Sequence, residues 1–172
     1  EEMLSEVYYK IGSIQWRKGF YNEGMSSYTK SLEILKNIYG NSHPKTTKVL
    51  NQMARLLTVN SRSSEAYEVV QRVIQILKRN NENNHIELAK AYDNLAWIYR
   101  EQLKYKEALE SLEKSIEIKE KYQGEDKLSE LGFSMNRLAR IYYLLTDFDK
   151  AQALYDKVAE YYLQYYGEGH PV

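Results

Sequence analysis

Apolar and polar residues follow a helical period along most of the chain. Leucine, isoleucine and alanine recur at spacings of three and four residues among glutamates and lysines, and the alternation typical of a half-buried strand is weak. Only 2 prolines and 8 glycines interrupt 172 residues. The pattern therefore predicts an all-α protein.

The helical pattern itself repeats every 42 or 43 residues. Small residues mark the period in two series, which are Gly24, Ala66, Ala108 and Ala151, and Gly12, Ala54, Ala96 and Ala139. A small residue at the same place in each of two helices lets their backbones approach where they cross. One repeat is then a helix hairpin that cannot bury its apolar face alone, so the copies stack. The predicted hairpins span about residues 5–44, 45–86, 87–128 and 129–171.

Each junction between hairpins carries residues that end one helix and begin the next. In the first junction, Gly40 suits the position just past a helix and Pro44 suits a first helical turn, with Ser42 or His43 as the N-cap. The second junction is rich in asparagine, and the third contains Gly124. The three histidines, His43, His85 and His170, occupy the same place in the first, second and fourth junctions. Since stacked repeats would separate these places by roughly 20 Å, we interpret the histidines as structural rather than catalytic.

The segment "AYDNLAWIYREQLKYKEALESLEKSIEI", residues 91–118, resembles a tetratricopeptide repeat (TPR). The signature positions of that motif are held by Tyr92, Leu95, Ala96, Tyr99, Ala108, Leu112 and Ser115. The 42-residue period with Gly-x-x-His-Pro between repeats is similar to the long variant found in kinesin light chains. The resemblance implies a right-handed α-α superhelix, a TPR solenoid of four helix hairpins, whose first helices line a concave groove for a partner protein.

Composition and motifs exclude several classes of function. Twenty-four basic and 24 acidic residues cancel, and no apolar run reaches the length of a bilayer span, so we expect neither a nucleic acid nor a membrane as partner. The chain has no cysteine and lacks the phosphate-loop, zinc-protease and hydrolase motifs. We therefore expect no enzyme activity, cofactor or metal site. The expected location is cytoplasmic, with a cytoskeletal or ciliary place left open.

The two helices of each hairpin differ in charge. The four first helices together carry a net charge of +5 and the four second helices −1, which predicts a mildly basic groove. Helical spacing selects as peptide-binding residues Lys48, Asn51, Arg55, Lys90, Asn94, Trp97, Phe133, Asn136, Arg137 and Arg140. Amides would bond the peptide backbone, arginines would bind carboxylates, and the aromatic rings would floor a pocket. The predicted ligand is an acidic peptide with an aromatic anchor.

Other functions remain open at this point. The array could be a structural spacer or assembly segment, or a regulatory array that senses a peptide and controls an attached effector domain. The last repeat ends in "YGEGHP", residues 166–171, which copies the first junction at residues 39–44. We therefore expect the array to continue into a further repeat, or its uncapped end to meet a partner, including a second copy in end-to-end self-association.

Overall fold

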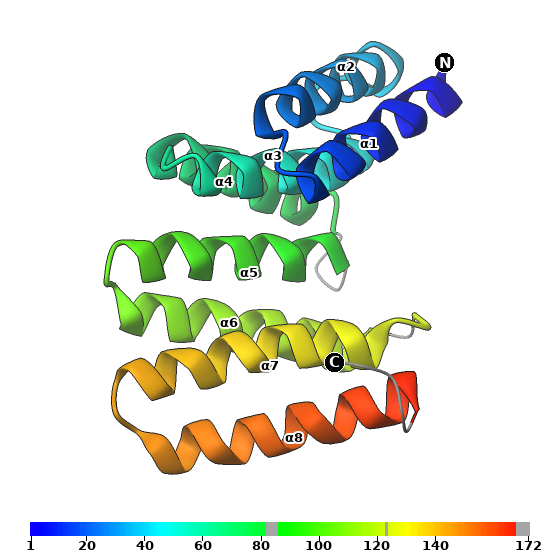
Figure 1. Ribbon diagram of the computed structural model, residues 1–172. Helices are drawn as coiled ribbons and strands as arrows, with labels where there is room; N and C mark the ends of the chain where they lie inside the picture. The colour runs from blue at the N-terminus through cyan, green and yellow to red at the C-terminus, as the bar shows by residue number, and fades with distance from the viewer. Residues whose placement is uncertain (82–85, 123, 168–172) are drawn as a thin grey trace. The chain divides into compact units, whose positions relative to one another are not determined.

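Helices form nearly all of the computed structural model, which describes residues 1–81, 86–122 and 124–167 (Figure 1). The elements are α1 (Glu2–Arg17), α2 (Tyr21–Tyr39), the short 3-10 helix η1 (Pro44–Thr46), α3 (Thr47–Val59), α4 (Ser63–Arg79), α5 (Ile86–Glu101), α6 (Tyr105–Lys121), α7 (Lys127–Leu144) and α8 (Phe148–Tyr166). These described ranges contain no strand. The predicted all-α repeat fold of four hairpins is confirmed. None of the helices in these ranges is long and apolar enough to cross a membrane.

The chain forms two compact units, each made of two hairpins. Unit 1 is Glu1–Asn83 and contains α1 to α4, and unit 2 is Asn84–Val172 and contains α5 to α8. Each first helix packs along the second helix that follows it. In unit 1, α2 also packs against α3, and in unit 2, α6 packs against α7, so the hairpins of each unit are stacked.

Small residues stand where the helices of a hairpin cross, as the repeat pattern predicts. In the first hairpin, a Cβ atom added to Gly12 would lie 3.2 Å from the carbonyl oxygen of Gly24 and 2.8 Å from the Tyr28 ring. The corresponding alanines in the three later hairpins, 54, 66, 96, 108, 139 and 151, are at most 2% exposed. Only glycine allows the close approach that the Tyr28 ring imposes on the first hairpin.

All four hairpin turns share one backbone conformation. The residues Gly19, Ser61, Leu103 and Thr146 have φ angles of +80°, +59°, +59° and +62°. The next residue donates its N–H to the carbonyl five residues earlier, as in Phe20 to Gln15 at 2.9 Å and Asp147 to Tyr142 at 3.0 Å. This is the Schellman motif, in which glycine is preferred at the left-handed position. In three of the four turns a residue other than glycine occupies the left-handed position, so the sequence alone does not reveal the Schellman motif there.

The first junction has the predicted form. Gly40 adopts a φ of +85° just past α2, and His43 is the N-cap of η1, whose first residue is Pro44. The His43 Nδ1 atom accepts the Lys45 N–H at 3.2 Å, and its ring stacks on Tyr39 at 4.7 Å between centroids. His43 is therefore part of a cap. The equivalent His85 and His170 lie outside the described residues.

The later junctions differ from one another. Asn81 takes a positive φ of +58° after α4, as expected of the most tolerant residue type after glycine. Gly124, which we expected at the end of the preceding helix, lies two residues beyond the extended C-cap Tyr122. Its carbonyl accepts the Lys127 N–H at 3.1 Å, so this glycine belongs to the turn that begins α7.

Candidate functional site

An arginine stacked on two aromatic rings marks the face that α5 and α7 form in unit 2. The guanidinium carbon of Arg137 lies 4.4 Å from the centre of the Phe133 ring and 5.2 Å from that of Trp97. Its Nη1 atom donates to the carbonyl oxygen of Asp93 at 2.8 Å. Phe133 is 39% exposed, and Trp97 and Arg137 are half-buried. The arrangement presents an apolar surface and a fixed cation together.

A small pocket lies beside this cluster, between α5, α6 and α7. It is lined by Ala96, Trp97, Arg100, Leu112, Arg137 and Ile141 and has a volume of about 20 Å³, room for about one water molecule. At its rim Trp97 Nε1 donates to Glu101 Oε1 at 3.2 Å, and Arg100 bonds the same oxygen. The hydrogen bond from Arg100 is the main cause of a pKa of Glu101 below its ordinary range. Glu101 therefore stays ionised and holds the indole in place.

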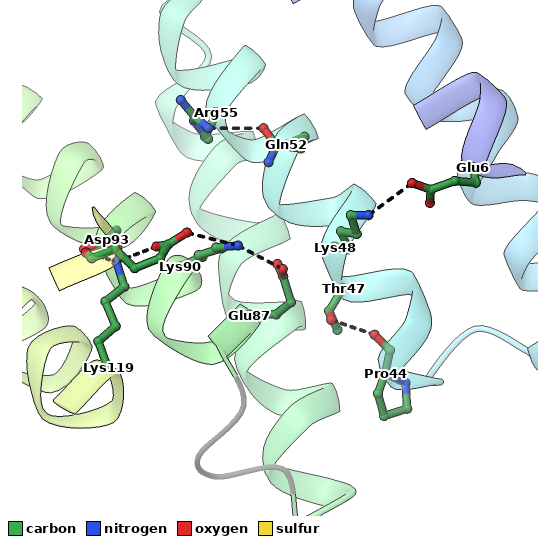
Figure 2. A network of polar contacts seen from close by, with 11 residues as sticks. Glu6, Pro44, Thr47, Lys48, Gln52, Arg55, Glu87, Lys90, Asp93 and Lys119 are labelled. Atoms are coloured by element: carbon green, nitrogen blue, oxygen red, sulfur yellow. Dashed lines mark hydrogen bonds and ion pairs between the residues drawn. The ribbon is translucent and has the colours of Figure 1, made fainter. Parts of the chain in front are cut away.

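A buried lysine, Lys119, lies close to this cluster, with its Nζ atom 5.7 Å from the centre of the Phe133 ring; Figure 2 shows it beside Asp93. Lys119 of α6 is fully buried, and its Nζ atom lies 2.7 Å from Asp93 Oδ2 and 3.0 Å from Glu130 Oε2. It also donates to Ser134 Oγ at 2.7 Å, and Ser134 donates to Asp93 Oδ1 at 2.7 Å. Lys119 thus ties one side chain of α5 to two of α7.

Lys90 is held at the edge of this ionic cluster. Its ammonium lies 3.3 Å from Glu130 Oε1 and 3.5 Å from Glu87 Oε1 (Figure 2). Burial lowers the pKa of Lys90, but the two carboxylates outweigh burial and leave that pKa above its ordinary value. The predicted site residue Lys90 is therefore a charged partner of two carboxylates within unit 2.

The predicted site residues of unit 1 are engaged in the same way with their neighbours. Lys48 lies 3.4 Å from Glu6 Oε1, with its ammonium 4.2 Å from the centre of the Tyr9 ring. Arg55 donates to Gln52 Oε1 at 3.2 Å and stacks at 5.1 Å on the Trp16 ring. An arginine on a tryptophan thus occurs in both units.

The basic excess expected for the first helices is smaller in the structure. Helix α1 begins at Glu2, so it includes an acidic residue that the sequence count placed outside it. Glu2 Oε1 lies 2.6 Å from Lys45 Nζ, which also donates to the Tyr39 hydroxyl at 2.8 Å. The hydrogen bond from Lys45, followed by that from Tyr39, lowers the pKa of Glu2. Lys45 and Lys48 are therefore neutralised locally by carboxylates of α1.

The three predicted asparagines differ in exposure. Asn51 and Asn94 are 1% and 4% exposed, whereas Asn136 is exposed. A side chain as buried as the first two has no room to meet a peptide backbone from solvent. The exposed members of the predicted set on α7 are Phe133, Asn136 and Arg140.

Lys119 is the residue that the sequence interpretation missed. It lies on a second helix, near exposed Lys121 and Glu117, and helical spacing alone does not separate it from them. A signal was available in the repeat, because the equivalent positions one and two periods earlier hold Leu77 and Leu35, both buried. A lysine at an otherwise apolar repeat position predicts a buried charge that needs a carboxylate.

The fold and the repeat positions define the class of protein as an all-α helical-repeat protein built from stacked hairpins. Three sequence models, each described as a tetratricopeptide repeat, match residues 5–36, 48–121 and 134–172. The chain belongs to the tetratricopeptide repeat family, as predicted. Proteins of this family are in general protein–protein interaction modules rather than enzymes.

Similar proteins come from several organisms. The crystal structure of BtubC (BKLC) from P. vanneervenii has a TM-score of 0.77 at 19% identity, over 98% of this chain and 66% of that one. A putative kinesin light chain from Podosopora anserina with nearly identical TPR-like repeats has a TM-score of 0.65 at 16% identity, over 95% and 97%. At these identities the likeness concerns the fold.

One sequence relative is the clustered mitochondria protein homolog of Culex quinquefasciatus. It is 28% identical over 67 residues, which is 39% of this chain. The match spans 5% of the length of that relative.

Proposed function

We propose that the chain captures a partner peptide, acidic and with an aromatic anchor, on the face of unit 2 formed by α5 and α7. The stacking of Arg137 on Phe133 and Trp97 carries the proposal. Aromatic residues and arginine are the side chains most often responsible for binding energy at protein interfaces. In this chain the two kinds of residue lie together on one helix face, and the chain belongs to a family of interaction modules.

Two kinds of contact would act together in this capture. A carboxylate of the peptide would bind Arg140, which is exposed on α7 one turn beyond Arg137. Such charge-assisted hydrogen bonds are about twice as strong as neutral ones. An apolar or aromatic side chain would cover Phe133 beside the small pocket at Trp97. The ionic cluster around Lys119 supports this face from below by fixing α5 to α7.

The burial of Asn51 and Asn94 changes the mechanism from the one that the sequence favours. The peptide backbone would find no amide of these two residues at the surface. Recognition then depends on side chains of the peptide, so the motif should be short and specific. Asn136, which is exposed on α7, remains a candidate for a backbone contact.

A fluorescence-polarisation screen of acidic peptides with and without one aromatic residue tests this function. We expect micromolar binding to the wild type and at least tenfold weaker binding to Phe133→Ala and Arg140→Glu. Lys106→Glu is the matched control, because it makes the same charge change on an exposed residue of α6. Equal affinity for wild type, Arg140→Glu and Lys106→Glu, or no binding by any acidic peptide, would overturn the proposal.

A further inference from the structure

The first helix exposes a row of apolar side chains. Leu4, Val7, Ile11 and Ile14 of α1 are 38% to 55% exposed, and Met3 is 84% exposed. Three repeat periods later, Leu131, Ser134, Leu138 and Ile141 hold the equivalent positions of α7 and are at most 8% exposed. Ser134 bonds Ser115 and Lys119, and Leu138 and Ile141 share a core cluster with Leu112 of α6. The row on α1 is therefore the face by which a first helix packs on a preceding hairpin.

The last hairpin has the complementary feature. A hollow of about 420 Å³ lies between α7 and α8 and is lined by Asn136, Tyr155, Val158, Tyr162 and Leu163 among others. One period earlier, the first four of these positions hold Asp93, Leu112, Ser115 and Lys119. Three of those four bond or contact Ser134 of α7 in the stacked pair of hairpins, and Leu112 lies in the adjoining core cluster. The hollow is therefore equivalent to the surface of the α5–α6 hairpin on which α7 packs in unit 2. We call that occupied surface the filled seat.

The side chains of the two exposed faces match each other chemically. In the filled seat, α6 offers Lys119 and Ser115, and α7 supplies Glu130 and Ser134. In the hollow, Tyr162 and Val158 hold the positions of Lys119 and Ser115. On α1, Met3 and Val7 hold those of Glu130 and Ser134. An ionic and polar set is replaced on both sides by an apolar one, so neither face would bury an uncompensated charge against the other.

We propose that the α1 face of one molecule docks into the hollow between α7 and α8 of a second copy of this chain, head to tail. Val7 takes the place of Ser134, opposite Val158. The interface uses two different faces of the same chain, so a docked pair still presents one α1 face and one hollow, and a third copy can add at either of them. Assembly should therefore pass beyond the dimer as concentration rises. The two faces do not include Arg137, Phe133 or Trp97 of the arginine–aromatic cluster, although Asn136 lines the hollow and is also a candidate contact in the proposed function.

Sedimentation velocity of the 172-residue chain over a concentration series tests the docking. We expect the weight-average sedimentation coefficient to rise steadily with concentration for the wild type. Val7→Glu blocks the α1 face and Tyr155→Glu blocks the hollow, and each alone should stay monomeric. Each variant keeps one intact face, so an equal mixture should form dimers and nothing larger. Leu144→Glu, which changes an exposed leucine of α7 outside both faces, should assemble like the wild type.

The mixture also separates blocked docking from misfolding, because a misfolded variant could not restore the dimer. Disulfide cross-linking tests directly which residues meet in the interface. Introduced cysteines report this without interference, because the chain has no cysteine of its own. The Ser115 and Ser134 hydroxyls that mark the filled seat are 3.2 Å apart. Val7→Cys mixed with Val158→Cys should therefore form an intermolecular disulfide, while Val7→Cys mixed with Glu160→Cys should not. A wild type that stays monomeric throughout, or a Val7→Glu variant that still self-associates, would overturn the inference.

Discussion

Removing the charge of Lys119 should destabilise unit 2 strongly. The Lys119→Met substitution keeps the length and apolar stem of the side chain but leaves the Asp93 carboxylate, 3% exposed, without its ammonium partner. Ser134 would remain as a donor to that carboxylate. Breaking a buried ion pair by removing one partner costs about 3–5 kcal/mol. We expect a loss in that range in the free energy of unfolding of unit 2.

The assay is urea unfolding followed by the fluorescence of Trp97, in a Trp16→Phe background so that the signal reports unit 2. Lys121→Met on the same helix is the matched control. It removes an equal charge from an exposed pair with Glu117 and should leave the midpoint unchanged. Adding Asp93→Asn to Lys119→Met should recover part of the loss, because a neutral amide is cheaper to bury than a carboxylate.

Two results would refute this reasoning. One is a loss below about 1 kcal/mol for Lys119→Met, which would mean that water or a backbone shift solvates Asp93 as well as the lysine does. The other is a double variant no more stable than Lys119→Met alone. In that case the loss would come from packing around the lysine stem rather than from the stranded carboxylate.

Three further predictions follow from local geometry. Gly12→Ala should cost about 1–3 kcal/mol in thermal or urea unfolding, because its Cβ would meet the buried Tyr28 ring at 2.8 Å, and a cost no larger than that of Gly24→Ala would contradict this. Thr146→Gly should raise stability by about 1 kcal/mol by relieving a β-branched residue at a φ of +62°, whereas no gain in the melting temperature would mean that the threonine makes a compensating contact. The Glu2 pKa is lowered, so the Glu2–Lys45 contact should stabilise unit 1 fully above the ordinary value of 4.5 and be lost as pH falls through the lowered pKa. NMR titration should show the Glu2 pKa moving back toward its ordinary value in Lys45→Gln, with the remaining Tyr39 hydrogen bond keeping part of the lowering.

Features that depend on the repeat period alone could be predicted from the sequence. The small residues at Gly12 and its equivalents, the hairpins and the cap formed by His43 all follow from spacing and from the conformational preferences of glycine and proline. Each of these is a local property or one that recurs in four copies. A feature that recurs in several repeats can be predicted with the repeats as independent support for one interpretation.

Features that depend on one tertiary contact could not be predicted in this way. Asn51 and Asn94 satisfy the spacing of a groove residue, but the spacing does not reveal that neighbouring side chains cover them. Lys45 reads as part of a basic face until Glu2, 43 residues earlier, is placed beside it. The net charge of this first-helix face in unit 1 is therefore set by a partner distant in sequence.

The buried lysine makes the four hairpins non-interchangeable. Its repeat position holds Leu35, Leu77, Lys119 and Tyr162 in turn, and only the third needs Asp93 beside it and Ser134 on the next helix. A chain with its third and fourth hairpins exchanged would keep every family signature and the Asp93 partner within the third hairpin, yet would remove the Glu130 and Ser134 acceptors that α7 supplies to that ammonium. The buried contacts between Lys119 and the following hairpin therefore favour one order of otherwise similar repeats.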